Sequence, residues 1–83
     1  MHPALYQQDN MKSKLIIEAQ KIIESYDSQG WKPFCFQFNK VENIGVCRLK
    51  HKNGNNMEIY INYLYEEIVV KVNDKLKDRL KIG

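Results

Sequence analysis

Residues 31–64 read WKPFCFQFNKVENIGVCRLKHKNGNNMEIYINYL, and this stretch decides the fold of the chain. Apolar and polar residues alternate in it over three runs, which is typical of strands with one buried face. The alternation predicts strands over about 33–39, 44–51 and 57–64. The segment from Lys52 to Asn56 predicts a reversal between the second and third strands, because Asn and Gly tolerate positive φ. We therefore expect a meander of three antiparallel strands.

The apolar residues of the first and third strands fall on one side of each strand. They are Phe34, Phe36 and Phe38 on the first, and Met57, Ile59, Ile61 and Tyr63 on the third. Antiparallel sheets commonly bury one face and leave the other in water. We therefore expect these side chains to pack against helices.

An amphipathic helix is predicted before the strands, over about Met11–Ser28. Its apolar residues recur at steps of three and four and are Leu15, Ile16, Ala19, Ile22, Ile23 and Tyr26. Gly30 can take the left-handed conformation that ends a helix. Residues 1–9 carry no period, so we expect a flexible N-terminal arm there and a single α+β domain over residues 10–83.

The segment after residue 65 fits two interpretations. A helix stripe would consist of Val69, Val72, Leu76 and Leu80. A strand would alternate Ile68, Val70 and Val72. We favour a helix from about Glu66, which gives the order helix, three-stranded antiparallel meander, helix (αβββα). The alternative is a short fourth strand at 67–72, followed by a helix from Asp74.

The composition indicates a small folded protein and does not favour nucleic acid or a membrane as its partner. The chain has 83 residues, a hydrophobic fraction of 43% and a net charge of +3, which is modest for a nucleic-acid binder. No apolar run approaches the ~20 residues that span a bilayer, so we expect no membrane contact. The first residues lack the features of a signal peptide, and the two cysteines mark no disulfide framework. We therefore expect a cytoplasmic protein with reduced thiols.

No group of residues carries a catalytic or metal-binding signature. Cys35, Cys47 and His51 are the soft ligands available beyond His2, but Cys47 and His51 would lie about 13 Å apart on a strand. His51 as a general base has no neighbour at a spacing that would orient it. We therefore expect no catalytic residue, no metal and no cofactor.

Two surfaces are candidates for binding. Aromatic side chains can anchor a protein partner, and the candidates are Trp31, Tyr60, Tyr63 and Tyr65. Basic residues of the second strand and of the C-terminal segment could instead contact nucleic-acid phosphates. These are Arg48, Lys50, His51, Lys52, Lys75, Lys77 and Lys81.

Several short motifs resemble the N-terminal half of SprT-like zinc metalloprotease domains. They are Gly30-Trp31, Phe36-Gln37-Phe38-Asn39, Gly45-Val46-Cys47 and Ile59-Tyr60-Ile61-Asn62. The resemblance covers about Trp31–Leu80 and implies a helix, three strands and a helix bearing His-Glu-x-x-His. This chain has Asp78-Arg79-Leu80-Lys81-Ile82 where that motif would fall. The resemblance therefore implies a degenerate domain without zinc or proteolysis.

A weaker resemblance is to HicA-type toxins, which cleave RNA and have a double-stranded-RNA-binding-like fold. It is carried by Gly30-Trp31, His51-Lys52-Asn53-Gly54 and Leu80-Lys81-Ile82-Gly83. The catalytic histidine step of that family would fall at Gly45-Val46-Cys47, where there is no histidine. This resemblance implies the same topology without the active residue.

These observations favour a small non-catalytic binding module. Lys outnumbers Arg by eleven to two, a bias typical of AT-rich coding DNA. We therefore expect a phage- or plasmid-type protein that binds and inhibits or modulates a host protein, and a homodimer is compatible with this. The alternatives are an αβββα domain that binds RNA or DNA, and a HicA-like ribonuclease.

Overall fold

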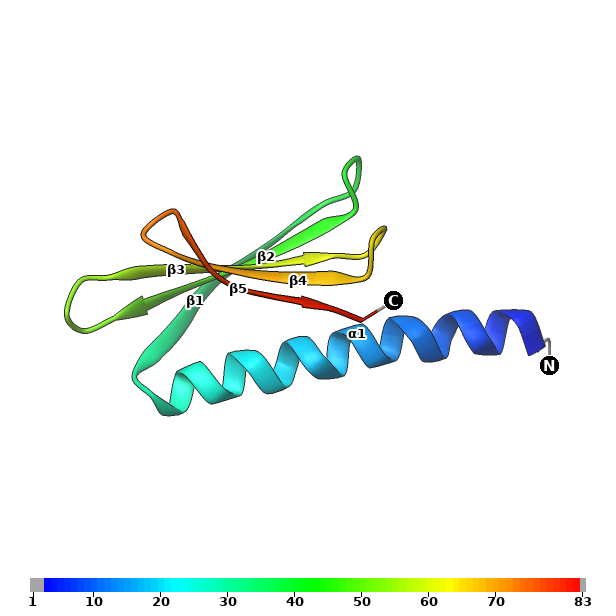
Figure 1. Cartoon of the computed structure of the whole chain (residues 1–83), viewed down its shortest axis with the longest axis horizontal. Helices are drawn as coiled ribbons and strands as arrows, with labels where there is room; N and C mark the ends of the chain where they lie inside the picture. Colours follow the sequence, from blue (N-terminus) through cyan, green and yellow to red (C-terminus); the bar gives the residue numbers. More distant parts are fainter. Residues whose placement is uncertain (1–2, 83) are drawn as a thin grey trace.

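The computed structural model describes residues 3–82, with side chains from Lys14 onward (Figure 1). A long helix, α1 (Pro3–Ser28), precedes five strands. The strands are β1 (Trp31–Asn39), β2 (Ile44–His51), β3 (Asn56–Asn62), β4 (Glu67–Val72) and β5 (Lys75–Lys81). They form one antiparallel sheet in the order β1-β2-β3-β4-β5, so each strand pairs with its neighbours in sequence.

The structure confirms an α+β fold and the three predicted strands, but the αβββα order is wrong. The segment predicted as a helix from Glu66 forms β4 and β5 instead. The final helix that both family resemblances imply is therefore absent from residues 3–82. The alternative strand at 67–72 is present, whereas the helix from Asp74 is not. Asn73 and Asp74 have φ values of 50° and 67°, the pattern of a two-residue type I′ hairpin turn. This turn joins β4 to β5, which pair antiparallel.

The leading helix is longer than its apolar stripe predicts. It begins at Pro3 rather than near Met11, so residues 3–9 are helical instead of forming a loose arm. Proline suits the first helical position because its missing N–H would have no partner there. Residues 1 and 2 of the predicted arm lie outside the described part of the chain. No helix within residues 3–82 is long and apolar enough to cross a membrane.

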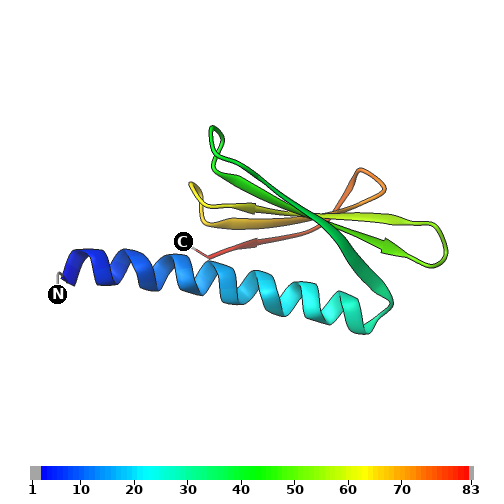
Figure 2. The ribbon, with the colours of Figure 1, turned by 180° about the vertical axis from the view of Figure 1, so that it is seen from behind.

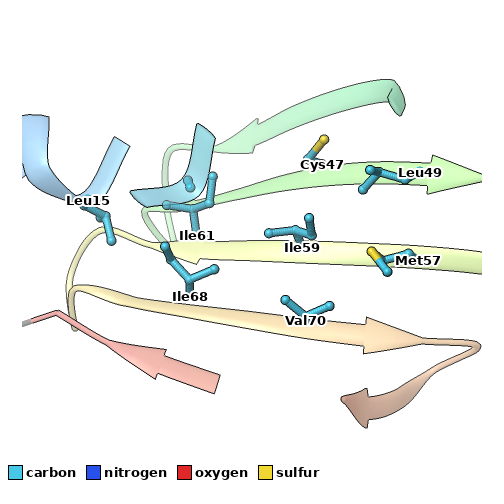
Figure 3. Packing of buried hydrophobic residues seen from close by; sticks show 9 residues of the cluster. Leu15, Cys47, Leu49, Met57, Ile59, Ile61, Ile68 and Val70 are labelled. Carbon is cyan, nitrogen blue, oxygen red and sulfur yellow. The ribbon is translucent and has the colours of Figure 1, made fainter. Parts of the chain in front are cut away.

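The core lies between α1 and the middle three strands of the sheet. Its buried residues are Leu15, Ala19, Cys47, Leu49, Met57, Ile59, Ile61, Ile68 and Val70. Figure 3 shows the side chains of β2, β3 and β4 pointing to the same side of the sheet. Alternation in these strands therefore reflects burial, as the sequence predicts for β2 and β3.

Two hairpin loops use the same construction. The side chains of Asn39 and Asn62 each accept two hydrogen bonds from backbone N–H groups two and three residues further on, at 2.9–3.1 Å. Each loop ends on a residue with positive φ, Asn43 at 61° and Glu66 at 52°. Asparagine at the first position thus fixes the turns after β1 and after β3.

Candidate functional site

The edge strand β1 carries three exposed phenylalanines, which we call the phenylalanine row. Phe34, Phe36 and Phe38 are 63%, 57% and 46% exposed. Phe36 lies opposite Cys47 and Phe38 opposite Gly45, so both rings are on the helix-bearing face of the sheet. The prediction that this row packs under a helix is therefore wrong, although the face is correct for Phe36 and Phe38.

The row is exposed because α1 and β1 diverge. They join at one end through residues 29–30, and there the ammonium of Lys32 binds the Asp27 carboxylate at 2.7 Å. From this end β1 rises away from the helix toward the β1–β2 turn, as Figures 1 and 2 show from opposite sides. Phe36 and Phe38 thus extend beyond the part of the sheet that α1 covers.

Neighbouring residues hold two of the rings in place. The Phe38 ring packs edge-on against Tyr63, with a centroid distance of 5.6 Å. Phe36 lies over Gly45, and a Cβ at Gly45 would approach Phe36 Cζ to 3.1 Å. The glycine therefore lets the Phe36 ring lie close to β2. The register shifts between Pro33 and Cys35, which places Phe34 at a bulge. Phe34 there lines a pocket with Arg48 and Glu58, on the face of the sheet opposite to Phe36 and Phe38.

The two edges of the sheet differ sharply in charge. β1 has no charged residue from Pro33 to Asn39. β5, at the other edge, carries five charged residues in seven, which are Lys75, Lys77, Asp78, Arg79 and Lys81. Charged edges discourage further strand pairing, and an uncharged apolar edge favours it. The β1 edge is therefore the better candidate for contact with another strand.

The opposite face of the sheet carries a polar cluster that is satisfied internally. Glu58 accepts hydrogen bonds from Arg48 Nε at 3.3 Å and from the Tyr60 hydroxyl at 2.9 Å. Arg48 Nη1 also donates to the Gln37 side chain at 2.6 Å. Partial burial, followed by the hydrogen bond and charge of Glu58, raises the pKa of Tyr60. A tyrosine held in its neutral form by a carboxylate is not an activated acid or base.

His51 serves as a joint between the helix end and the β2–β3 hairpin. Its Nδ1 accepts a hydrogen bond from the Asn53 N–H at 3.3 Å, and its Nε2 lies 3.3 Å from the Gln29 carbonyl. Because Nδ1 accepts, the proton of the neutral ring belongs on Nε2. Trp31 packs edge-on against the ring at 5.1 Å. Both ring nitrogens are thus engaged by the backbone, which argues against the general-base role.

The thiols do not form a metal or redox pair. Cys47 is buried with the core, whereas Cys35 lies opposite Arg48 on the other face of the sheet. Both cysteines are free. Burial, and secondarily the nearby Cys35, raises the pKa of the Cys47 thiol. Among the described residues, no group of three His, Cys, Asp or Glu side chains could hold a metal ion.

The four predicted aromatic anchors do not form one surface. Trp31 lies beside His51, whereas Tyr63 lies beside Gly45, about 20 Å away along β2. Tyr60 is on the opposite face of the sheet, where Lys71 Nζ lies 5.1 Å from its ring centroid. Tyr65 is 64% exposed in the loop after β3. Of the four, Tyr63 packs against the phenylalanine row, through Phe38.

The predicted basic residues are also divided between two regions. Lys50, His51 and Lys52 surround a shallow depression with Lys32, next to the end of α1. Arg48 is occupied by Glu58. The remaining residues, Lys75, Lys77 and Lys81, lie on β5, a strand rather than the predicted helix. β5 is three strands away from β2, or about 14 Å.

Sequence reasoning placed the phenylalanine row in the core and so missed it as a contact surface. One signal could have identified it, because the first strand of a meander is an edge strand and this one lacks charge. Comparisons with protein-family models, curated proteins and solved structures find no match to this chain. The resemblances to SprT-like domains and HicA-type toxins therefore stay predictions.

Proposed function

We propose that this protein is a small non-catalytic module that binds protein through the free edge of β1. The observation that carries the proposal is the row of three exposed phenylalanines on an uncharged edge strand. A strand added to this edge would satisfy the free backbone groups of β1. Its apolar side chains on the core face would cover the Phe36 and Phe38 rings, which supply large contact areas at low entropic cost.

The remaining chemistry of the chain supports a binding role over an enzymatic one. His51 holds two backbone segments together, Cys47 is buried, and Glu58 is engaged by Arg48 and Tyr60. The free thiols on opposite faces of the sheet suit a reducing compartment such as the cytoplasm. Inhibition of a host protein by a phage- or plasmid-type chain rests on composition and stays a prediction.

A peptide-library selection tests the proposal directly, because it requires no natural partner. We expect peptides selected on the immobilised protein to be uncharged, with apolar residues at alternate positions. Phe36→Lys should weaken their binding more than tenfold, because it places a charge in the centre of the contact. Leu76→Lys is the matched control, since Leu76 is 60% exposed on the opposite edge strand, and it should leave binding unchanged.

The same variants separate protein binding from nucleic-acid binding. Contacts to phosphates weaken steeply as salt rises, because binding releases counterions. If a labelled RNA bound, if its affinity fell as salt rose, and if Phe36→Lys left that affinity unchanged, the result would favour nucleic-acid binding through the basic residues. Selected peptides whose binding survives Phe36→Lys would refute the β1 edge as the contact element.

A further inference from the structure

A pocket on the face of the sheet opposite to the core, which we call the far face, plays no part in the proposed β1 contact. It extends across β1 to β4, with Phe34 at one end and Lys71 at the other, beside Asp74 of the β4–β5 turn. We propose that this pocket binds an apolar α-amino acid as its zwitterion. The side chain of the ligand contacts Phe34, its carboxylate meets Lys71, and its ammonium group meets Asp74. This site goes beyond the proposed function and does not depend on it.

The bulge in β1 supplies the apolar wall of the pocket. Regular alternation would place Phe34 on the core face with Phe36, but the register shifts between Pro33 and Cys35. Phe34 lines the far-face pocket instead and is 63% exposed, so its ring is available to a ligand. Bulges often re-aim a side chain beside a functional site. The bulge therefore turns one phenylalanine of β1 to a different use from the others.

The charged groups in the middle of the pocket already have partners. Arg48 Nε donates to Glu58 at 3.3 Å, and Arg48 Nη1 donates to the Gln37 side chain at 2.6 Å. The other carboxylate oxygen of Glu58 accepts a hydrogen bond from the Tyr60 hydroxyl at 2.9 Å. Arg48 and Glu58 thus neutralise each other, and the charges left for a ligand are those of Lys71 and Asp74.

Lys71 and Asp74 carry opposite charges without being paired to each other. Among the side chains that the structure describes, neither takes part in a salt bridge. The Lys71 ammonium lies 5.1 Å from the centroid of the Tyr60 ring. Partial burial is the main cause of the raised pKa of Tyr60, and the negative charge of Asp74 adds to it. Both charges are therefore close to Tyr60 on the far face.

This arrangement of charges selects a zwitterion. The pocket is lined by the cations of Arg48 and Lys71 and by the anions of Glu58 and Asp74, so it has no net charge. A ligand with one kind of charge would leave either Lys71 or Asp74 without a partner. A purely apolar ligand would displace water from both groups and replace none of its hydrogen bonds. A zwitterion gives each group an oppositely charged hydrogen-bond partner.

The wall and the volume of the pocket specify the rest of the ligand. The exposed ring of Phe34 offers apolar surface to the side chain of the ligand. The volume is about 360 Å³, near the lower end of the range for ligand pockets. Lys71 and Asp74 are three residues apart, and an α-amino acid carries both of its charges on one carbon atom. A longer peptide separates these charges, so a single amino acid fits best.

The turn that carries Asp74 holds the carboxylate in place. The Asn73 side chain accepts a hydrogen bond from the Asn56 N–H at 3.0 Å and donates one to the Asn55 side chain at 3.2 Å. Asp74 has a φ of 67°, which glycine adopts more readily than aspartate. Strained residues cluster at ligand sites, where the surrounding contacts hold them. The carboxylate of Asp74 thus has a position that the turn itself does not require.

Titrations with three related compounds, followed by NMR, test the class of ligand. L-Phenylalanine is the probe, phenylpropionate lacks its ammonium group, and phenethylamine lacks its carboxylate. We expect L-phenylalanine to shift the backbone amide signals of Arg48, Glu58 and Lys71. Each analogue should bind about tenfold more weakly or worse, because it leaves one charge of the pocket without a partner.

Three variants locate the site. Asparagine also tolerates positive φ, so Asp74→Asn removes the charge and keeps the turn. It should weaken the binding of L-phenylalanine about tenfold without weakening that of phenylpropionate. Phe34→Ala should weaken all three compounds. Leu64→Ala is the matched control, because Leu64 is 65% exposed and lies outside the pocket, and it should leave binding unchanged.

Three results would overturn the inference. One is the absence of any shift with L-phenylalanine up to its limit of solubility. Another is equal binding of the three compounds, which would show that the charges are not recognised. The last is unchanged binding to Asp74→Asn and Phe34→Ala proteins whose spectra show that they are folded, which would place the ligand elsewhere.

Discussion

Gly30→Ala tests whether the junction between α1 and β1 is built around His51. Gly30 has a φ of 99°, a conformation that side chains rarely adopt, and a Cβ there would lie 2.9 Å from His51 Nε2. The backbone conformation alone costs about 1–2 kcal/mol for a residue with a Cβ. Displacement of the ring also breaks its contact with the Gln29 carbonyl, at roughly 1 kcal/mol. We expect Gly30→Ala to lower the free energy of unfolding by about 2–3 kcal/mol.

Gly54 provides the matched control within the same chain. Its φ is 94°, but a Cβ there meets no atom within 4 Å. Gly54→Ala should therefore cost the backbone part alone, and the two variants should differ by about 1 kcal/mol, or about 1 M urea in midpoint. In a His51→Ala background, Gly30→Ala should lose its extra cost. Equal midpoints for the two glycine variants in the wild-type background would refute the role assigned to His51.

Two further predictions concern the β4–β5 turn and the buried thiol. Asp74→Gly should raise the free energy of unfolding by roughly 0.5–1 kcal/mol, because glycine adopts the φ of 67° without strain; an unchanged melting temperature would contradict a type I′ turn. The pKa of Cys47 is raised above its ordinary value of 9.0, so the thiol binds its proton more tightly in the folded than in the unfolded chain. The stability from this protonation is complete below pH 9 and is lost at higher pH, so the free energy of unfolding should fall there. Cys47→Ala should flatten that slope in urea titrations at increasing pH, and a slope equal to that of wild type would contradict it.

The part of the fold that sequence predicts well is the part in which local pattern and tertiary pairing agree. β2 was predicted with its observed bounds, Ile44–His51, because its alternation matches the single face buried against α1. The turns also follow from local chemistry, since Asn39 satisfies the backbone of its own loop. Neither feature depends on residues that are distant in the sequence.

The C-terminal segment could not be decided from its own residues. Val69, Val72, Leu76 and Leu80 recur at helical spacing, yet the sheet places Val69 opposite Tyr60 on the far face from the core. What favours the strand is the pairing of residues 67–72 with β3, a contact that lies outside any local window. Tertiary pairing therefore overrides an ambiguous local period, as β-propensity often does.

The candidate site was missed for a related reason. Alternation in β1 identifies the face of Phe36 and Phe38 correctly, but it reveals neither the bulge at Phe34 nor how much of that face α1 covers. Aromatic residues chosen by type alone, such as Tyr60 and Trp31, lie on different faces or at different ends of the sheet. A surface depends on which strands are neighbours and on where the helix ends, and neither can be obtained from residue type.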